Sequence, residues 1–281
     1  GRDDAVLYNK LGYQADDKTD KSVSKTLEIC WEDFAISRLA ASLGNREDAD
    51  IFAGHARFYR NLWNPATKYF QPRDSNGAFF KEFKPQLLSY ADFSGRHTKA
   101  YCEGSAEQWR WAVPFDPEGL IALFGGPEPF VRALATFFEN STKGVGVWNP
   151  GPFYWHGNEP DIFSVYLFNS AGRPDLTQKW VRWILDTKYA DKYYGLDGND
   201  DGGTLSAWYV FSALGFYPVA GTTKYQVGSP LFDKAVMQMG EGKTLTVVAE
   251  NNGPRNVYVQ RVSLNGTPLG KTWFDHSDIA G

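Results

Sequence analysis

Residues 195–219 read Gly-Leu-Asp-Gly-Asn-Asp-Asp-Gly-Gly-Thr-Leu-Ser-Ala-Trp-Tyr-Val-Phe-Ser-Ala-Leu-Gly-Phe-Tyr-Pro-Val. The first half is a glycine-rich loop that holds Asp197, Asp200 and Asp201, and the second half is apolar and aromatic. This pattern predicts a loop followed by a helix over 203–214. Carboxylates on flexible backbone beside a rigid helix suit acid/base chemistry on a polar substrate, or the binding of a hard cation.

Two segments upstream have the same character. Tyr-Cys-Glu-Gly-Ser-Ala-Glu-Gln-Trp-Arg-Trp occupies 101–111, and His-Gly-Asn-Glu-Pro-Asp occupies 156–161. Each places an acid beside a glycine, just before a predicted helix. Ser105 and Gln108 match a capping box, so a helix should begin just after Glu103.

The first three-quarters of the chain read as helices joined by loops of Gly, Pro, Asn and Asp. Besides the helices named above, the expected ones are 22–43, Asn45 to about Trp63, a helix from Asp116-Pro117 to Gly125, 128–140, Pro160 to Gly172, and Pro174 to Tyr189. Residues 64–100 are turn-rich and should form a long excursion over one face. Short links favour antiparallel helix pairs, and a ring of such pairs would bring the three acidic segments to one end.

After Pro218 the pattern changes to short β-strands, and Asn265-Gly266 is a hairpin-turn signal. The expected strands begin near Tyr225, Ala235, Thr244 and Val257. The sequence therefore predicts a mainly α region at 1–219 and a small antiparallel β region at 220–281.

The composition excludes several classes of protein. With 42% hydrophobic and 22% charged residues, the 281-residue chain should bury a core and is not disordered. A net charge of −4 argues against nucleic acid or an anionic membrane surface as partner, and no apolar run could span a bilayer. The ten Trp are typical of sites where flat rings meet sugars, although packing between helices is the commoner role of any one Trp. Cys30 falls on an apolar helix face, which favours a buried free thiol over a bridge.

Together these segments resemble the calcium-dependent exo-α-mannosidases of glycoside hydrolase family 92. The motifs that carry the resemblance are Tyr101-x-Glu-Gly-Ser105, Trp111-Ala-Val-Pro114, Gly157-Asn-Glu-Pro-Asp161, Leu167-Phe-Asn-Ser-Ala-Gly-Arg-Pro174, Gly198-Asn-Asp-Asp201, Ser206-Ala-Trp-Tyr209 and Leu214-Gly-Phe-Tyr-Pro-Val219. The resemblance implies that 1–219 is the latter part of an (α/α)₆ catalytic barrel, and that a β-sandwich domain missing from this chain helps to close the active site. It also implies an extracellular or periplasmic enzyme that removes terminal α-linked mannose from N-glycans or mannans.

An inverting mechanism follows from the same resemblance. One carboxylic acid protonates the leaving oxygen, and a second carboxylate activates a water on the opposite ring face. The resemblance implies Glu103 as the acid and Asp201 as the base. Members often carry another acid two residues before the base; this chain has Asn199 there, which could orient the water by hydrogen bonding.

The resemblance further implies Ca²⁺, which would hold the O2 and O3 hydroxyls of a flattened sugar ring. Asn158 and Glu159 are the expected ligands, and such oxygen donors suit a hard cation. The expected substrate-binding residues are Trp155, His156 and Asp200. For Trp155 and His156 a packing role is equally consistent with the sequence, and Asp200 also fits a cap for the next helix.

Each assignment has a structural alternative. Without the resemblance, Glu103 reads as a partner for a helix dipole, and Asn158-Glu159 as a capping pair before Pro160. Asp161 is expected to serve the helix terminus. Two other functions also stay open: hydrolysis of a mannose-1-phospho-mannose linkage, in which Glu103 would be expendable, and carbohydrate binding without catalysis.

Overall fold

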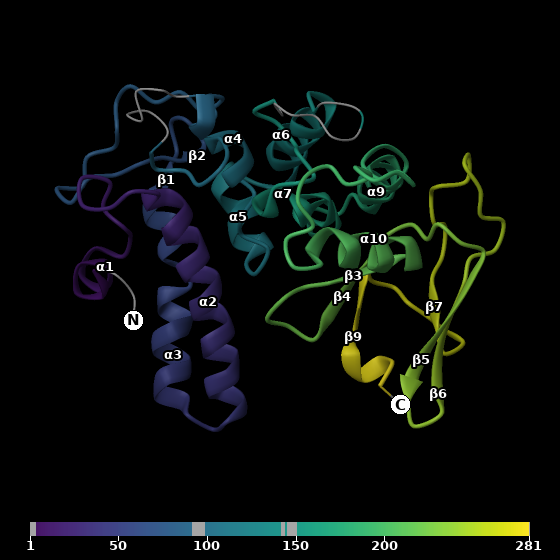
Figure 1. Cartoon of the computed structure of the whole chain (residues 1–281). Helices are drawn as coiled ribbons and strands as arrows, with labels where there is room; N and C mark the ends of the chain where they lie inside the picture. The colour runs from purple at the N-terminus through teal and green to yellow at the C-terminus, as the bar shows by residue number, and fades with distance from the viewer. Residues whose placement is uncertain (1–3, 92–98, 142–143, 145–150, 281) are drawn as a thin grey trace.

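The N-terminal part of the fold is an antiparallel helix pair. The computed structural model describes residues 4–91, 99–141, 144 and 151–280, and α1 (Ala5–Leu11) leads into α2 (Ser22–Ser42) and α3 (Arg46–His55). The long helices α2 and α3 lie side by side at one edge of the molecule (Figure 1). Asn45 caps α3 by accepting a hydrogen bond from the Asp48 backbone N–H, as its sequence position predicted.

The helix after Asn45 ends earlier than predicted. A 3₁₀ helix (Phe58–Leu62) follows α3, and the chain is already extended at β1 (Trp63–Asn64), which pairs with β2 (Tyr69–Phe70). The chain leaves the α-helical path after His55, so the expectation of one helix to about Trp63 was wrong.

Short helices make up the middle of the chain (Figure 1). The capping box of Ser105 and Gln108 is formed as predicted, and Asp116, the predicted start of the next helix, caps α5. The helices of this part are α4 (Ala106–Trp109), α5 (Pro117–Phe124), α6 (Pro127–Glu139), α9 (Pro174–Thr187) and α10 (Thr204–Leu214).

The single helix expected from Pro160 to Gly172 is broken into pieces. It consists of α7 (Glu159–Ile162), a 3₁₀ turn (Ser164–Tyr166) and α8 (Leu167–Ser170). The Ser164 hydroxyl donates to the Asp161 carbonyl at 2.6 Å, and the Trp208 indole donates to the Ile162 carbonyl at 2.9 Å. Because side chains take these carbonyls, they are withdrawn from a continuous helical ladder.

The C-terminal part is built from small antiparallel sheets. One has the order β3-β4-β9, and two others are the hairpins β5-β6 and β7-β8. The strands are β3 (Phe216–Pro218), β4 (Lys224–Val227), β5 (Lys234–Gly240), β6 (Lys243–Val248), β7 (Ser263–Leu264), β8 (Thr267–Pro268) and β9 (Trp273–Asp275).

Two predictions for this part differ in outcome. Asn265 and Gly266 form the expected hairpin turn, with φ of 50° and 79°. The strand expected from Val257 is absent, since the Val257 carbonyl accepts from the Ser229 hydroxyl and the Val259 N–H donates to the side chain of Gln178. The sheet of β3 and β4 has a strand on each side of the boundary expected between 219 and 220.

Aromatic side chains fill the core. Trp111 stacks on Phe124 with centroids 5.4 Å apart and meets Phe130 edge-on at 5.6 Å. Many of the aromatic residues therefore pack in the core, which is the role that the sequence analysis gave as the commoner one for any single Trp. Cys30 is a buried free thiol, as predicted, and burial raises its pKa to about 12. Among the helices of the described ranges, none has the length and apolar character needed to cross a bilayer.

Candidate active site

Glu103 lies in a turn that is held in place by two hydrogen bonds of the preceding residue, Cys102. Its φ is 46°, in the left-handed region, which costs a residue with a side chain about 1 kcal/mol or more and persists only where surrounding contacts impose it. The Cys102 N–H donates to the Ser24 hydroxyl at 2.8 Å, and the Cys102 carbonyl accepts from the Trp109 indole at 2.8 Å. These contacts hold the turn while the Glu103 side chain stays exposed.

Asp201 also has left-handed backbone, with φ of 49°. Its carbonyl accepts from the Thr204 hydroxyl at 2.7 Å, which fixes the turn at the start of α10. The Asp200 carboxylate accepts hydrogen bonds from the Ser206 N–H at 3.0 Å and from the Ser206 hydroxyl at 2.8 Å. It therefore caps α10, which is the structural role that the sequence also allowed. The Asp201 and Asn199 side chains are exposed beside it.

The segment 155–158 joins these two turns. The Asn158 side-chain amide donates to the Glu103 carbonyl at 3.0 Å, and the Trp155 indole N–H donates to the Asp197 carbonyl at 2.6 Å. At Gly157 the backbones touch, because an added Cβ would lie only 2.2 Å from the Asp197 carbonyl oxygen. The structure thus brings together the three acidic segments that the sequence singled out.

His156 lies in the interior, contrary to the expected contact with substrate. It is fully buried, and its two ring nitrogens lie 2.6 Å from the hydroxyls of Tyr154 and Tyr189. The Tyr189 hydroxyl donates to the Leu205 carbonyl, so it must accept from His156 Nε2–H, and Nδ1 accepts from Tyr154. Burial lowers the pKa of His156 to about 3, with the charge of Lys188 as a smaller cause, so the imidazole is neutral. His156 therefore supports the loop from below, while Trp155 stays partly exposed.

A buried ion pair supports the loop before Asp201. Lys188 Nζ and Asp197 Oδ2 are 3.1 Å apart, and both side chains have no exposed surface. Lys188 Nζ also donates to the Gly144 carbonyl at 3.3 Å. Removing one member of such a pair typically costs about 3–5 kcal/mol because the other charge is left buried. The sequence showed Asp197 as one more loop acid and gave no signal for Lys188.

The Asp161 side chain holds the segment 155–158, whereas the sequence predicted that it would serve the helix terminus. Its side chain is fully buried and accepts from the Trp155 N–H at 2.9 Å. Burial raises the pKa of Asp161 well above its usual value, and the nearby charge of Glu107 raises it further.

The expected metal ligands differ in exposure. Asn158 is buried and Glu159 is exposed at the start of α7. On α2, partial desolvation raises the pKa of Glu28, and the charges of Glu32 and Glu159 raise it further, so α2 adds negative potential near Glu159. The described residues contain no group of three or more His, Cys, Asp or Glu arranged to hold a metal. The sequence offered no signal that α2 lies here, since Glu28 reads as one charge on a long helix.

Gly157→Ala should lower the free energy of unfolding by about 1–3 kcal/mol, because the new Cβ overlaps the Asp197 backbone and forces the two loops apart. Urea unfolding of the two proteins measures this. Gly54→Ala in α3 is the matched control: nothing lies within 4 Å of its added Cβ, so it should be neutral or slightly stabilising. Equal effects of the two substitutions would contradict the close approach.

The pH dependence of stability should report the neutral His156. The unfolded chain protonates this histidine below its ordinary pKa of 6.5, whereas the folded chain does so only near pH 3, so its contribution to stability is lost as the pH falls below 6.5. Between about pH 7.5 and about pH 5 the loss should be about 2 kcal/mol. His156→Gln should remove that part of the dependence in urea unfolding; an unchanged pH dependence would show that folding does not lower the pKa of His156.

This chain is similar to proteins of known family. The family model of the glycosyl hydrolase family 92 catalytic domain matches residues 1–281. An uncharacterized secreted glycosidase of Arthroderma benhamiae is 27% identical over 274 residues, covering 92% of this chain and 34% of the relative.

Two solved structures from Bacteroides thetaiotaomicron are also similar. A family GH92 α-mannosidase in complex with mannoimidazole has a TM-score of 0.91 at 35% identity, over 100% of this chain and 37% of that chain. A GH92 inverting mannosidase has a TM-score of 0.87 at 33% identity, over 100% and 39%. The chain spans little more than a third of the length of these relatives. Since the family model matches it from end to end, the chain belongs to glycosyl hydrolase family 92.

Proposed function

We propose that this chain carries the catalytic centre of an inverting exo-α-mannosidase. The observation that carries the proposal is the joining of the two carboxylate turns through 155–158, by the bonds of Asn158 to the Glu103 carbonyl and of Trp155 to the Asp197 carbonyl. Membership of family 92 and likeness to solved α-mannosidases support the reaction class.

Glu103 and Asp201 divide the chemistry between them. Glu103 protonates the leaving oxygen, and Asp201 takes a proton from the water that attacks the anomeric carbon from the opposite face. Both side chains are exposed, on turns with left-handed backbone. In this proposal Asn199, which is exposed two residues before Asp201, orients the attacking water.

The residues at 158–159 fit a calcium ion. The Asn158 Nδ2 is used by the Glu103 carbonyl, which leaves the amide oxygen for a cation, and Glu159 adds a carboxylate. Both are hard oxygen donors, and the negative potential from Glu28 suits a divalent cation. When bound, Ca²⁺ would hold two vicinal sugar hydroxyls and favour a flattened ring. In this proposal Asn158 and Glu159 orient that ion, and Trp155 and Asp200 border the sugar.

Membership of the family supports a substrate and a setting for the proposed enzyme. The proposed substrate is terminal α-linked mannose of N-glycans or mannans, and the mannoimidazole complex of a similar α-mannosidase supports a mannose-shaped site. The helices of 1–219 would belong to an (α/α)₆ barrel closed by a β-sandwich domain of the same protein. An extracellular or periplasmic location is supported by the secreted glycosidase among the relatives.

Glu103→Gln should lower kcat about 10²–10⁴-fold on a mannobiose, whose leaving group needs a proton. On an aryl mannoside with an acidic phenol the loss should be much smaller, because that group leaves without protonation. Steady-state kinetics with both substrates measure this. Equal losses would remove Glu103 from the role of acid.

Two further variants sharpen this test. Asp201→Asn should slow both substrates alike, because the attacking water is needed in either case. Glu118→Gln, at an exposed carboxylate in the first turn of α5, is the matched control and should change neither rate.

A further inference from the structure

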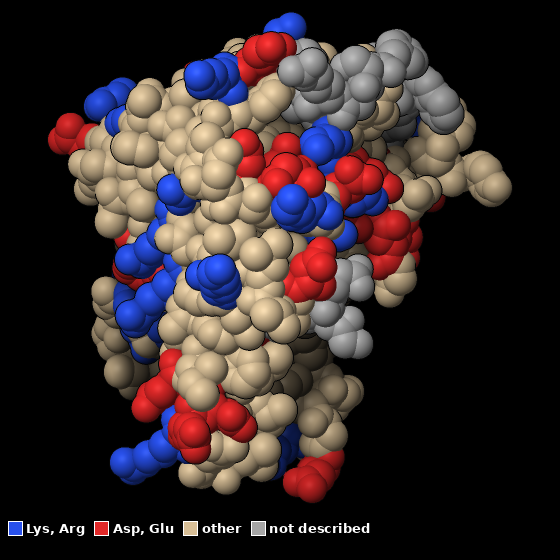
Figure 2. Space-filling model, turned by 90° about the vertical axis from the view of Figure 1, so that its left-hand side faces the viewer, with Lys and Arg blue, Asp and Glu red and all other residues tan. Residues whose placement is uncertain are grey.

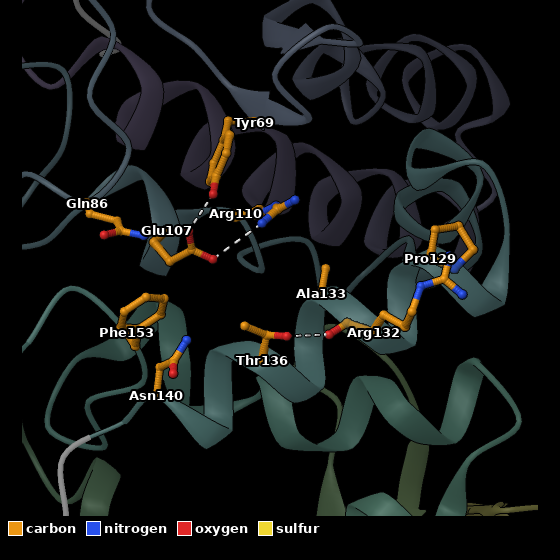
Figure 3. Close-up of a pocket in the computed structure, with 10 residues that line it drawn as sticks. All are labelled: Tyr69, Gln86, Glu107, Arg110, Pro129, Arg132, Ala133, Thr136, Asn140 and Phe153. Atoms are coloured by element: carbon orange, nitrogen blue, oxygen red, sulfur yellow. Dashed lines mark hydrogen bonds and ion pairs between the residues drawn. The ribbon is translucent and has the colours of Figure 1, made fainter.

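A second concave site lies between α4, α6 and the chain around Gln86 and Phe153. Its volume is about 420 Å³, within the range of small-molecule sites. Figure 3 shows Glu107 near its centre, with Tyr69 and Arg110 on one side and Phe153 and Asn140 on the other.

The floor of this pocket is polar and desolvated. Glu107 and Arg110 are only 5% and 8% exposed. The Glu107 carboxylate accepts from the Tyr69 hydroxyl at 2.5 Å and pairs with Arg110 Nη1 at 3.3 Å. The Arg110 guanidinium also lies 4.2 Å from the centroid of the Tyr69 ring and 4.7 Å from that of Phe124.

The floor of Glu107 and Arg110 can form further hydrogen bonds. Within the ranges that the structure describes, Arg110 Nε is buried without a hydrogen-bond partner. That atom has almost no exposed surface, so a ligand in the cavity would meet the Glu107 carboxylate instead. This carboxylate can accept more bonds than its two partners supply.

The chemistry of the lining selects a neutral, hydroxyl-rich ligand. Gln86 and Asn140 add two amides and Thr136 a hydroxyl to the floor pair, and Arg132 adds a second guanidinium at the rim. Each cation faces a carboxylate, Arg110 that of Glu107 and Arg132 that of Glu128, so the lining carries no unpaired charge that would select an anion. The charged floor disfavours a wholly apolar ligand. The half-buried Phe153 ring offers an apolar face against which the C–H groups of a sugar can pack.

One short helix and its hydrogen bonds connect the pocket to the proposed active site. Helix α4, which carries Glu107, is a single turn that begins just after Glu103. The Ser105 hydroxyl donates to the Pro152 carbonyl at 2.8 Å, and the Gln108 side-chain amide donates to the Phe153 carbonyl at 3.1 Å. One rigid turn of helix therefore separates Glu103 from Glu107 in the floor of the pocket.

We propose that this pocket is a second carbohydrate site, which binds one sugar unit of an oligomannoside whose terminal mannose occupies the centre at Glu103 and Asp201. The inference rests on the proposed function for its substrate. It assigns Tyr69, Glu107 and Arg110 to the polar floor, and Gln86 and Asn140 to contacts at the rim.

The test uses the whole protein with the rim substitutions Gln86→Ala and Asn140→Ala combined. The probes are a linear α-mannotriose and an aryl mannoside too short to span both sites. The ratio of kcat/KM for mannotriose to that for the aryl mannoside should fall about 10-fold, from the loss of two hydrogen bonds. Gln260→Ala, an exposed amide outside the pocket, is the control and should leave the ratio unchanged. An unchanged ratio in the double variant would overturn the proposal.

Direct binding separates this proposal from the function on which it rests. If the protein cleaves neither probe, the proposed function fails, and calorimetry of mannotriose binding then decides the pocket by itself. Binding that weakens about 10-fold in the double variant supports the second site. The proposal is overturned if mannotriose does not bind, if it binds both proteins equally, or if inorganic phosphate displaces it.

Discussion

The close approach of the backbones at Gly157 and Asp197 is the constraint on which the proposed catalytic centre depends. At this point a Cβ would lie 2.2 Å from a carbonyl oxygen, so the two loops can meet only with glycine at this position. The contact places the Trp155 indole on the Asp197 carbonyl and, on the other side, the Asn158 amide on the Glu103 carbonyl. One short segment thereby bonds to the backbone at Glu103 and at Asp197, which lies four residues before Asp201.

This segment rests on a buried polar layer that keeps it in one conformation. Beneath it lie the directed hydrogen bonds from Tyr154 through His156 and Tyr189 to the Leu205 carbonyl, and the enclosed pair of Lys188 and Asp197. Such groups cost free energy to bury, and they favour a single conformation only when every partner is in place. A small displacement of the loop would leave several of these groups unsatisfied together, so the layer resists gradual deformation.

The sequence predicted the features that depend on local geometry. The cap at Asn45 and the capping box at Ser105 each involve a partner three residues away, and both are formed. The break after Ile162 and the irregular chain after Val257 were missed, because each depends on a side chain distant in the sequence.

The residues of the candidate site also divide into those that a local sequence pattern predicts and those that it does not. Its three motif segments could be recognised because each carries its own pattern of acids and glycines, and the structure brings them together. The interior position of His156, the pairing of Lys188 with Asp197, and the approach of Glu28 to Glu159 could not be recognised. These depend on which helices pack side by side, and no local pattern encodes that.

The most direct test of this account is a crystal structure of the whole protein grown with Ca²⁺ and mannoimidazole. The account predicts a cation bound by Asn158 and Glu159, with the inhibitor ring between Glu103 and Asp201. The two carboxyl groups should be about 6.5–9.5 Å apart, which leaves room for a water on the side of Asp201. An inhibitor bound away from the three joined segments, or a cation held by other residues, would contradict it.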